Sequence, residues 1–414
     1  MTALPGPLDQ VPVTIRPARD AALLEVRGLR VDYGVGADAV HAVRDANLTL
    51  YPGEVLGLAG ESGSGKSTLA YAITRLLRAP GVITAGSVTY NLPTSSAGPL
   101  GNATPGDGNG NSAFHAGVDL LSASEAQLRG LRWSEIAVVL QSAMHALNPV
   151  MSIGTQLTDV LRVHRPDLDR RARMERAAEV LTMVGITADR LRAYPHELSG
   201  GMRQRAMIAM ALVLEPRIVI MDEPTTALDV VTQREILEEL AGLRERLGFA
   251  VLFITHDLSL LLEIADSITI MYAGRVIEQA SATDLFRAPR HPYTLGLLGS
   301  FPALHGPRVH MTGIPGSPPD LRQPPPGCPF HPRCPYVMDR CSRETPPLMP
   351  PARSGAGRRT VACWLQDPAT TKPVPAELAV NAAPGVPTTP NIPAKPNIPA
   401  KPKIPRKTDE GSAR

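Results

Sequence analysis

The chain has 414 residues, 43% of them hydrophobic, and a formal net charge of +3 at pH 7. This length can bury a sizeable core and predicts two or three domains, and so small a charge gives no argument for nucleic acid as a partner. No apolar run approaches the roughly 18 residues of a membrane-spanning helix, and the first 20 residues lack the apolar region of a signal peptide, so we expect a soluble cytosolic protein.

The chain divides into segments of different composition. Residues 1–22 are polar, contain prolines and show no periodicity, which predicts a flexible leader. Between residues 23 and 288, short β-branched runs alternate with stretches of helical period, as in an α/β layered domain. Residues 91–117 interrupt this pattern with Gly, Asn, Ser, Thr and Pro, so we expect a mobile surface insertion there.

The stretch GLAGESGSGKST predicts a phosphate-binding loop. An apolar strand at residues 55–59 precedes it and a helical pattern follows it, as a strand-loop-helix unit requires. The glycines allow a tight turn whose backbone N–H groups wrap phosphates, while the lysine would reach the β and γ oxygens and the next serine would bind Mg²⁺. The expected ATP-binding residues are Gly60, Glu61, Ser62, Gly63, Ser64, Gly65, Lys66, Ser67 and Thr68.

A second anion site is expected where LSGGMRQR opens a helix. A serine hydroxyl, bare glycine amides and the positive end of the helix dipole all favour an anion. Because the first loop already covers the nucleotide of its own chain, this helix end would close over the γ-phosphate held by another copy or partner. Its residues are Leu198, Ser199, Gly200, Gly201, Met202, Arg203 and Gln204.

Two adjacent acids follow the run IVIM at residues 218–221, which predicts a buried parallel strand. A carboxylate at that strand end can hold magnesium, so we assign this role to Asp222, and Glu223 could polarise the attacking water. The alternative is a strand that simply ends in solvated acids.

All four cysteines lie near the end of the chain, at Cys328, Cys334, Cys341 and Cys363. In a reducing cytosol such a group indicates metal ligands before disulfides. The spacing is not that of a zinc ribbon, and four thiolates suit either zinc or a four-iron cluster. Buried thiols without a metal remain a third interpretation.

The last segment, residues 366–414, is rich in proline and contains the repeat PNIPAK. Proline at this density favours polyproline II over helix and sheet. We therefore expect a disordered tail.

Six motifs in a fixed order carry a family resemblance: GESGSGKS, Gln141, LSGGMRQR, IVIMDE, TTALD and ITH. Over residues 23–288 the chain resembles the ATP-binding cassette of ABC transporters. The resemblance implies a P-loop NTPase fold of the α/β class with a helical subdomain at about residues 142–214. It also implies that two cassettes sandwich two ATP molecules head to tail.

The same resemblance assigns roles to four single residues. Tyr33 matches the aromatic residue that stacks on adenine, although a core tyrosine on a strand is the simpler alternative. Gln141 matches the glutamine that contacts Mg²⁺ and the attacking water and relays nucleotide state to the membrane partner. Asp229 matches an inter-subunit aspartate, and His256 matches the histidine at the γ-phosphate. With Glu223 also present, the resemblance implies an active ATPase.

Residues 289–365 resemble the C-terminal extension of the oligopeptide and dipeptide importer ATPases, through RHPYTLGLLGSFP, GCPFHPRCP, DRC and VACWL. This implies a peripheral subunit on the cytoplasmic face of the cell membrane, coupled to two permeases, a second ABC ATPase subunit and, indirectly, an extracellular solute-binding protein. It also favours a 4Fe-4S cluster on the four cysteines.

Two departures and two alternatives accompany this resemblance. The insertion at residues 91–117 replaces a short connection, and Leu140 and Ser142 flank Gln141 where an aromatic residue and an acid are common. The same machinery could import nickel or another small solute. The other alternative is a soluble ABC ATPase without membrane partners.

Overall fold

The computed structural model describes residues 21–91, 117–140, 146–226, 228–300, 313–351, 358–375 and 378. The predicted leader before residue 21, residues 92–116 of the predicted insertion and residues 379–414 of the predicted tail lie outside the described residues. Within these ranges, no helix combines the length and the apolar character needed to cross a membrane.

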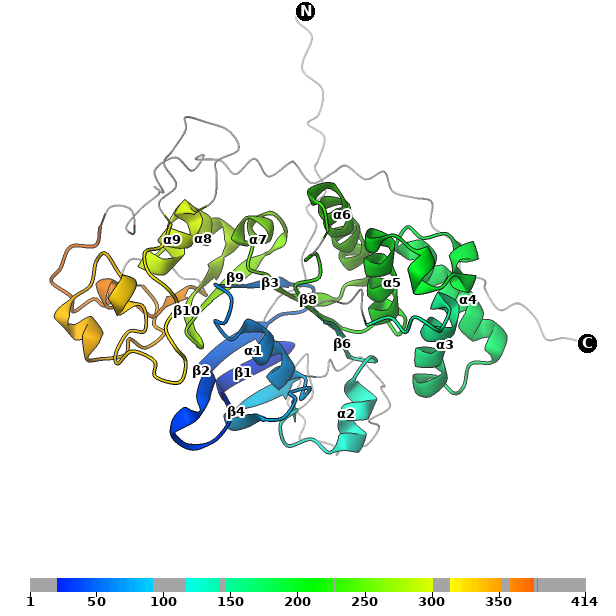
Figure 1. Cartoon of the computed structure of the whole chain (residues 1–414), viewed down its shortest axis with the longest axis horizontal. Helices are drawn as coiled ribbons and strands as arrows, with labels where there is room; N and C mark the ends of the chain where they lie inside the picture. Colours follow the sequence, from blue (N-terminus) through cyan, green and yellow to red (C-terminus); the bar gives the residue numbers. More distant parts are fainter. Residues whose placement is uncertain are drawn as a thin grey trace, which may run out of the picture.

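The described strands form two sheets (Figure 1). The smaller sheet is antiparallel, in the order β2-β1-β4-β5, and the larger one has the order β11-β10-β9-β3-β8-β7-β6, with a parallel centre from β9 to β6 and antiparallel pairing from β9 to β11. The bounds are β1 Leu24–Tyr33, β2 Val40–Leu50, β3 Val55–Ala59, β4 Gly81–Tyr90, β5 Val118–Asp119, β6 Ile136–Val139, β7 Ile218–Asp222, β8 Ala250–Ile254, β9 Ser267–Tyr272, β10 Arg275–Ser281 and β11 Thr360–Val361. The α/β class predicted for this region is confirmed.

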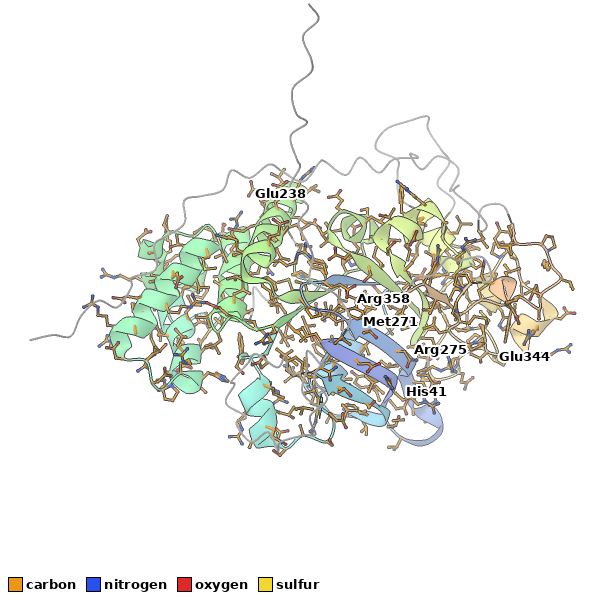
Figure 2. All side chains as sticks on the ribbon, turned by 180° about the vertical axis from the view of Figure 1, so that it is seen from behind. His41, Glu238, Met271, Arg275, Glu344 and Arg358 are labelled. Atoms are coloured by element: carbon orange, nitrogen blue, oxygen red, sulfur yellow. The ribbon has the colours of Figure 1, made fainter. Side chains whose placement is uncertain are left out.

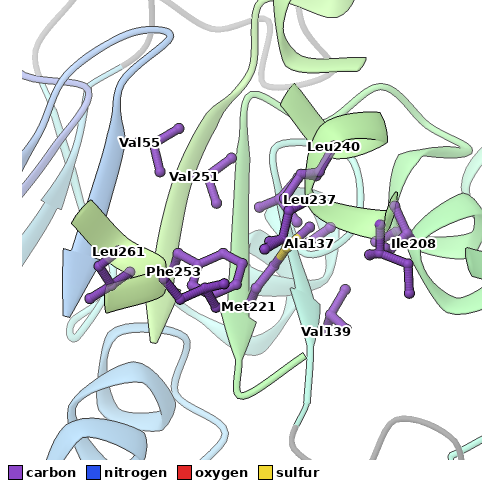
Figure 3. Close-up of a cluster of buried hydrophobic side chains, with 14 of the residues drawn as sticks. Val55, Ala137, Val139, Ile208, Met221, Leu237, Leu240, Val251, Phe253 and Leu261 are labelled. Atoms are coloured by element: carbon purple, nitrogen blue, oxygen red, sulfur yellow. The ribbon is translucent and has the colours of Figure 1, made fainter. Parts of the chain in front are cut away.

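Both faces of the large sheet are buried, which explains the continuous apolar runs in its parallel strands. Along β8, Val251 and Phe253 belong to one core cluster, and Leu252 and Ile254 belong to the other, because successive side chains of a strand point to opposite faces. Figure 3 shows the first cluster, with Phe253 and its neighbours packed between the strands and the helices above them. The small sheet and α1 cover the second face.

Helices surround the sheets, and α3, α4 and α5 gather at one end (Figure 1). They lie within the 142–214 range predicted for a helical subdomain. The bounds are α1 Lys66–Ile73, α2 Glu125–Leu131, α3 Ile153–His164, α4 Arg170–Met183, α5 Gly200–Leu212, α6 Val230–Leu247, α7 Leu258–Ile264, α8 Ala282–Arg287 and α9 Pro292–Gly299.

The C-terminal extension is joined to the cassette through β11, which pairs with β10. On β10 the fully buried carboxylate of Glu278 accepts hydrogen bonds from the backbone N–H groups of Arg290 and His291 and from the Arg359 guanidinium. A single carboxylate therefore ties together β10, the start of α9 and the strand of the extension.

Packed structure continues past residue 365, where the sequence predicted the disordered tail to begin. The side chains of Gln366 and Leu378 are buried, and the Leu378 carbonyl accepts a hydrogen bond from Arg290. The predicted boundary is thus too early, because the apolar Leu378 reaches back to the core after a proline-containing stretch that periodicity alone could not place.

Candidate nucleotide-binding site

A tight loop connects β3 to α1 at the centre of the large sheet. Gly60 and Gly65 have φ values of +151° and +99°, which L side chains rarely adopt. A Cβ at either position would also lie 2.2 Å from a backbone oxygen, that of Met271 or Ala42 respectively. Because the loop, Met271 and Ala42 approach one another so closely, glycine is required at both of these loop positions. Met271, which contacts the loop, is labelled in Figure 2.

The Lys66 side chain is buried beneath this loop. Its Nζ donates to the carbonyl oxygens of Gly60 at 2.8 Å and Glu61 at 3.0 Å. Burial lowers the pKa of Lys66, against the opposing effect of three nearby carboxylates, those of Glu223, Asp222 and Glu61. The loop thus holds one ammonium group among oxygen atoms, at the N-terminus of a helix that favours anions.

The loop meets β7 through Ser67 and Asp222. Ser67 Oγ donates to Asp222 Oδ1 at 3.0 Å, and burial raises the pKa of the Asp222 carboxyl group. Asp222 Oδ2 is also buried and has no hydrogen-bond partner among the described residues. A hydroxyl beside a carboxylate with an open oxygen is the ligand chemistry that Mg²⁺ uses, so these two residues fit a magnesium site.

Glu223 and His256 meet at the ends of adjacent strands, β7 and β8. Glu223 Oε1 lies 3.2 Å from His256 Nδ1, and Glu223 Oε2 accepts a hydrogen bond from Thr226 at 3.0 Å. Burial alone would raise the pKa of Glu223, but the hydrogen bonds from His256 and Thr226 outweigh it, and the pKa lies below its ordinary value. The carboxylate is therefore ionised at neutral pH and able to accept a proton.

Tyr33 lies at the end of β1, beside the start of α1. Its hydroxyl is 3.4 Å from the hydroxyl of Thr68, so the tyrosine belongs to the surroundings of the loop. Gln141 lies outside the described residues. Its assignment stays a prediction.

The signature segment lies apart from the phosphate loop of the same chain. Helix α5 packs beside β6, as Ile208 and Val139 show in Figure 3, while the loop follows β3. Three strand spacings separate β6 from β3, roughly 14 Å at about 4.8 Å each. Helix α5 therefore packs beside the last described strand of the large sheet, whereas the loop follows a strand three places further in.

Two predicted interface segments lie together at this end of the sheet. Ser199 caps α5 by accepting a hydrogen bond from Met202 N–H, and a Cβ on Gly201 would lie 2.6 Å from the side chain of Thr232 on α6. Asp229 caps α6 and accepts a hydrogen bond from the same Thr232 side chain at 2.7 Å. The hydrogen bonds from Thr232, backbone first, lower the pKa of Asp229. Thus Asp229 has a clear local function as a helix cap.

The four cysteines line one small cavity in the extension. Burial raises the pKa of Cys328 to about 12 and that of Cys334 to about 11, and it raises the pKa of Cys363 as well. Among the described residues, no three His, Cys, Asp or Glu side chains lie close enough to hold a single metal ion. The structure brings the four cysteines together, but among the described residues it gives no evidence of a site for a zinc ion or for a metal cluster.

One contact of the loop had no signal in the sequence. Arg333, within the cysteine-rich segment, pairs with Glu61 across 272 positions. The stretch GCPFHPRCP carries the family resemblance and two of the cysteines, but nothing in it indicates a partner for the arginine, and no spacing rule connects residues so far apart.

Comparison with known proteins agrees with the geometry. Residues 43–226 match the family described as ABC transporter, and residues 277–341 match the oligopeptide/dipeptide transporter C-terminal region. A dimeric ATP-binding cassette in a post-hydrolysis state with ADP and Pi has a TM-score of 0.51 and 26% identity, covering 63% of this chain and 98% of that one. The chain is thus an ATP-binding cassette protein that binds ATP with Mg²⁺ and hydrolyses ATP.

Relatives define a narrower group. The chain is 44% identical over 336 residues to a putative peptide import ATP-binding protein of Brucella melitensis, covering 79% of this chain and 93% of that protein. It is 42% identical to the oligopeptide transport ATP-binding protein OppD of Salmonella typhimurium (79% and 90% covered) and 41% identical to the dipeptide transport ATP-binding protein DppD of Bacillus subtilis (83% and 95% covered). The chain belongs to this family of oligopeptide/dipeptide transporter ATP-binding subunits.

Proposed function

We propose that this chain drives import of dipeptides and oligopeptides by hydrolysing ATP while it is bound to separate permease subunits. One observation carries the proposal: a complete phosphate loop with its acids occurs in the same chain as the oligopeptide/dipeptide transporter C-terminal region. The permeases, a second ATPase subunit and attachment to the cytoplasmic face of the membrane follow from this function.

In the proposed mechanism, the residues of one chain bind the phosphates and activate water. Lys66 and the backbone amides of the loop would neutralise the β and γ phosphates. Ser67 and Asp222, together with Gln141, would hold Mg²⁺, which would supply further positive charge for binding the phosphates. Glu223 would take a proton from the attacking water at a carboxylate oxygen, and His256 would orient that carboxylate and contact the γ-phosphate.

The second chain would supply the rest of the site. Ser199 and the N-terminus of α5 would close over the γ-phosphate held by the partner chain, with Asp229 at the subunit interface. The packing of α5 beside β6, three strands away from the strand that precedes the loop, supports this arrangement. Tyr33 would stack on the adenine, and the region around Gln141 would transmit closure to the permeases.

We propose the domain organisation that the sequence predicts, except that the tail begins later than residue 366. Residues 23–288 form the cassette and residues from 289 onward form the extension. For the four cysteines we keep the 4Fe-4S cluster as the proposed cofactor. Their convergence on one cavity supports it. The thiolates of a cluster bind different irons, so they lie farther apart than the ligands of a single metal ion. The cavity between the four cysteines would have to widen to hold the cluster.

Uptake by cells tests the transport proposal. A strain lacking this gene should lose uptake of a labelled tripeptide, and the wild-type gene but not Glu223→Gln should restore it, while nickel uptake is measured in parallel as the control. Normal peptide uptake in the deletion strain, or loss of nickel uptake alone, would contradict the peptide assignment. Anaerobic purification with iron, sulfide and zinc analysis tests the cluster: absence of iron and labile sulfide would exclude it.

A further inference from the structure

An ion pair joins the cysteine-rich extension to the phosphate loop. Arg333 Nη1 donates to Glu61 Oε2 at 2.8 Å and Nη2 donates to Oε1 at 3.1 Å, which is the bidentate arrangement that only arginine provides. The Arg333 side chain is 7% exposed and that of Glu61 is 25% exposed. Arg333 Nε also donates to the Pro315 carbonyl at 2.7 Å, so its guanidinium is fixed from both sides.

Glu61 is itself part of the loop, directly after Gly60. Its backbone N–H donates to the Tyr293 hydroxyl at 2.9 Å, and its carbonyl accepts a hydrogen bond from Lys66 Nζ. One residue thus connects the extension, helix α9 and the lysine expected at the phosphates. Any rotation of the Glu61 peptide would move the carbonyl that Lys66 contacts.

Packing makes this connection stiff. Phe330 from the cysteine-rich segment is buried against Tyr272 and Tyr293, with ring centroids 5.3 Å and 5.4 Å away. The Arg333 guanidinium lies 5.7 Å from the Tyr272 ring centroid and donates to the Tyr272 hydroxyl at 3.2 Å. Arg333 ends the short helix His331–Arg333 and directly precedes Cys334.

We propose that Arg333 is a positioning residue for the phosphate-binding loop, through which the cysteine-rich extension sets the affinity of the cassette for ATP. The ion pair holds the Gly60–Glu61 peptide, and with it Lys66, in one arrangement before nucleotide arrives, so binding spends less free energy on ordering the loop. The inference rests on the proposed role of this loop in phosphate binding.

The test compares ATP affinity in variants of the full chain. A fluorescent ATP analogue is titrated with Mg²⁺ into wild type, Arg333→Gln, Arg333→Lys, Glu61→Gln and the double variant, and KM and kcat are measured for each. Arg333→Gln should raise Kd and KM about tenfold with a smaller effect on kcat. The double variant should bind no more weakly than either single one, and Arg333→Lys should recover part of the affinity.

Arg340→Gln is the matched control. Arg340 also directly precedes a cysteine, and it forms ion pairs within the extension, with Glu344 at 2.7 Å and Asp367 at 2.9 Å. Its replacement should leave Kd unchanged. If it weakens ATP binding as much as Arg333→Gln does, the effect comes from disturbance of the cysteine region and the proposal is overturned.

Other results would overturn the proposed role of Arg333. Unchanged Kd in Arg333→Gln, or additive losses in the double variant, would overturn the proposal. If Arg333→Gln does not fold, Arg333→Lys and Glu61→Gln carry the comparison, and wild-type affinity in both would overturn it. Lys66→Ala distinguishes the role of Arg333 from the role of the loop in phosphate binding. If Lys66→Ala loses ATP affinity and Arg333→Gln keeps the wild-type Kd, only the role of Arg333 is refuted. If Lys66→Ala also binds ATP with the wild-type Kd, the phosphate-loop proposal is refuted as well.

Discussion

Replacement of Glu278 by alanine should release the C-terminal extension from the cassette. Glu278 is fully buried and accepts hydrogen bonds from the N–H groups of Arg290 and His291 and from Arg359. The change leaves two buried N–H donors without this acceptor, at about 1–3 kcal/mol each, and deprives a buried guanidinium of its carboxylate, at about 3–5 kcal/mol. Because Arg359 keeps a hydrogen bond to the Ala288 carbonyl and the site can relax, we expect a total loss at the lower end of this range, about 5 kcal/mol.

Urea unfolding followed by tryptophan fluorescence measures this loss. The chain has two tryptophans, and Trp364 lies in the extension, where its indole N–H donates to the Glu344 carbonyl. In a Trp133→Phe background Trp364 is the sole reporter, and its transition should move to lower urea in Glu278→Ala. Glu344→Gln, at an exposed position in the same extension, is the control and should change little. A shift below about 1 kcal/mol in Glu278→Ala would refute the reasoning, since it would mean that the buried donors find other partners.

Three other changes test the site and the domain boundary. Glu223→Gln should abolish hydrolysis, and ATP-bound dimers should accumulate and be detected by gel filtration. The pKa of Glu223 lies below its ordinary 4.5, so acidification from pH 8 to 6 should leave this carboxylate ionised in the wild type. Activity that titrates with Glu223 in that interval would contradict the assignment. Gly65→Ala should lower ATP affinity at least about tenfold, because its Cβ would overlap the Ala42 carbonyl, and unchanged binding in equilibrium titration would argue against a fixed loop. Truncation after residue 378 should preserve ATPase activity and melting temperature. Truncation after residue 366 should lower the melting temperature, because it removes the buried Leu378. Equal melting temperatures of the two truncated chains would show that this contact does not stabilise the protein.

Short-range sequence patterns were enough to predict the cassette and to propose the residues of its candidate site. The phosphate loop occupies consecutive residues between a strand and a helix, and the strand before Asp222 and Glu223 is a continuous apolar run, so each can be recognised locally. The α/β class follows from the same alternation of patterns. The order of these motifs then supplied the family, which the matches confirm.

Contacts between distant segments required the tertiary structure. Ser67 meets Asp222 across 155 positions and Glu61 meets Arg333 across 272, because parallel strands bring their carboxyl ends to one edge and the extension folds back onto the loop. The clustering of the four cysteines and the burial of Leu378 likewise depend on which surfaces pack together. The sequence by itself determined the local chemistry of this protein. The tertiary fold decided which charged groups face each other, because side-chain pairing over such distances leaves no periodic signal in the chain.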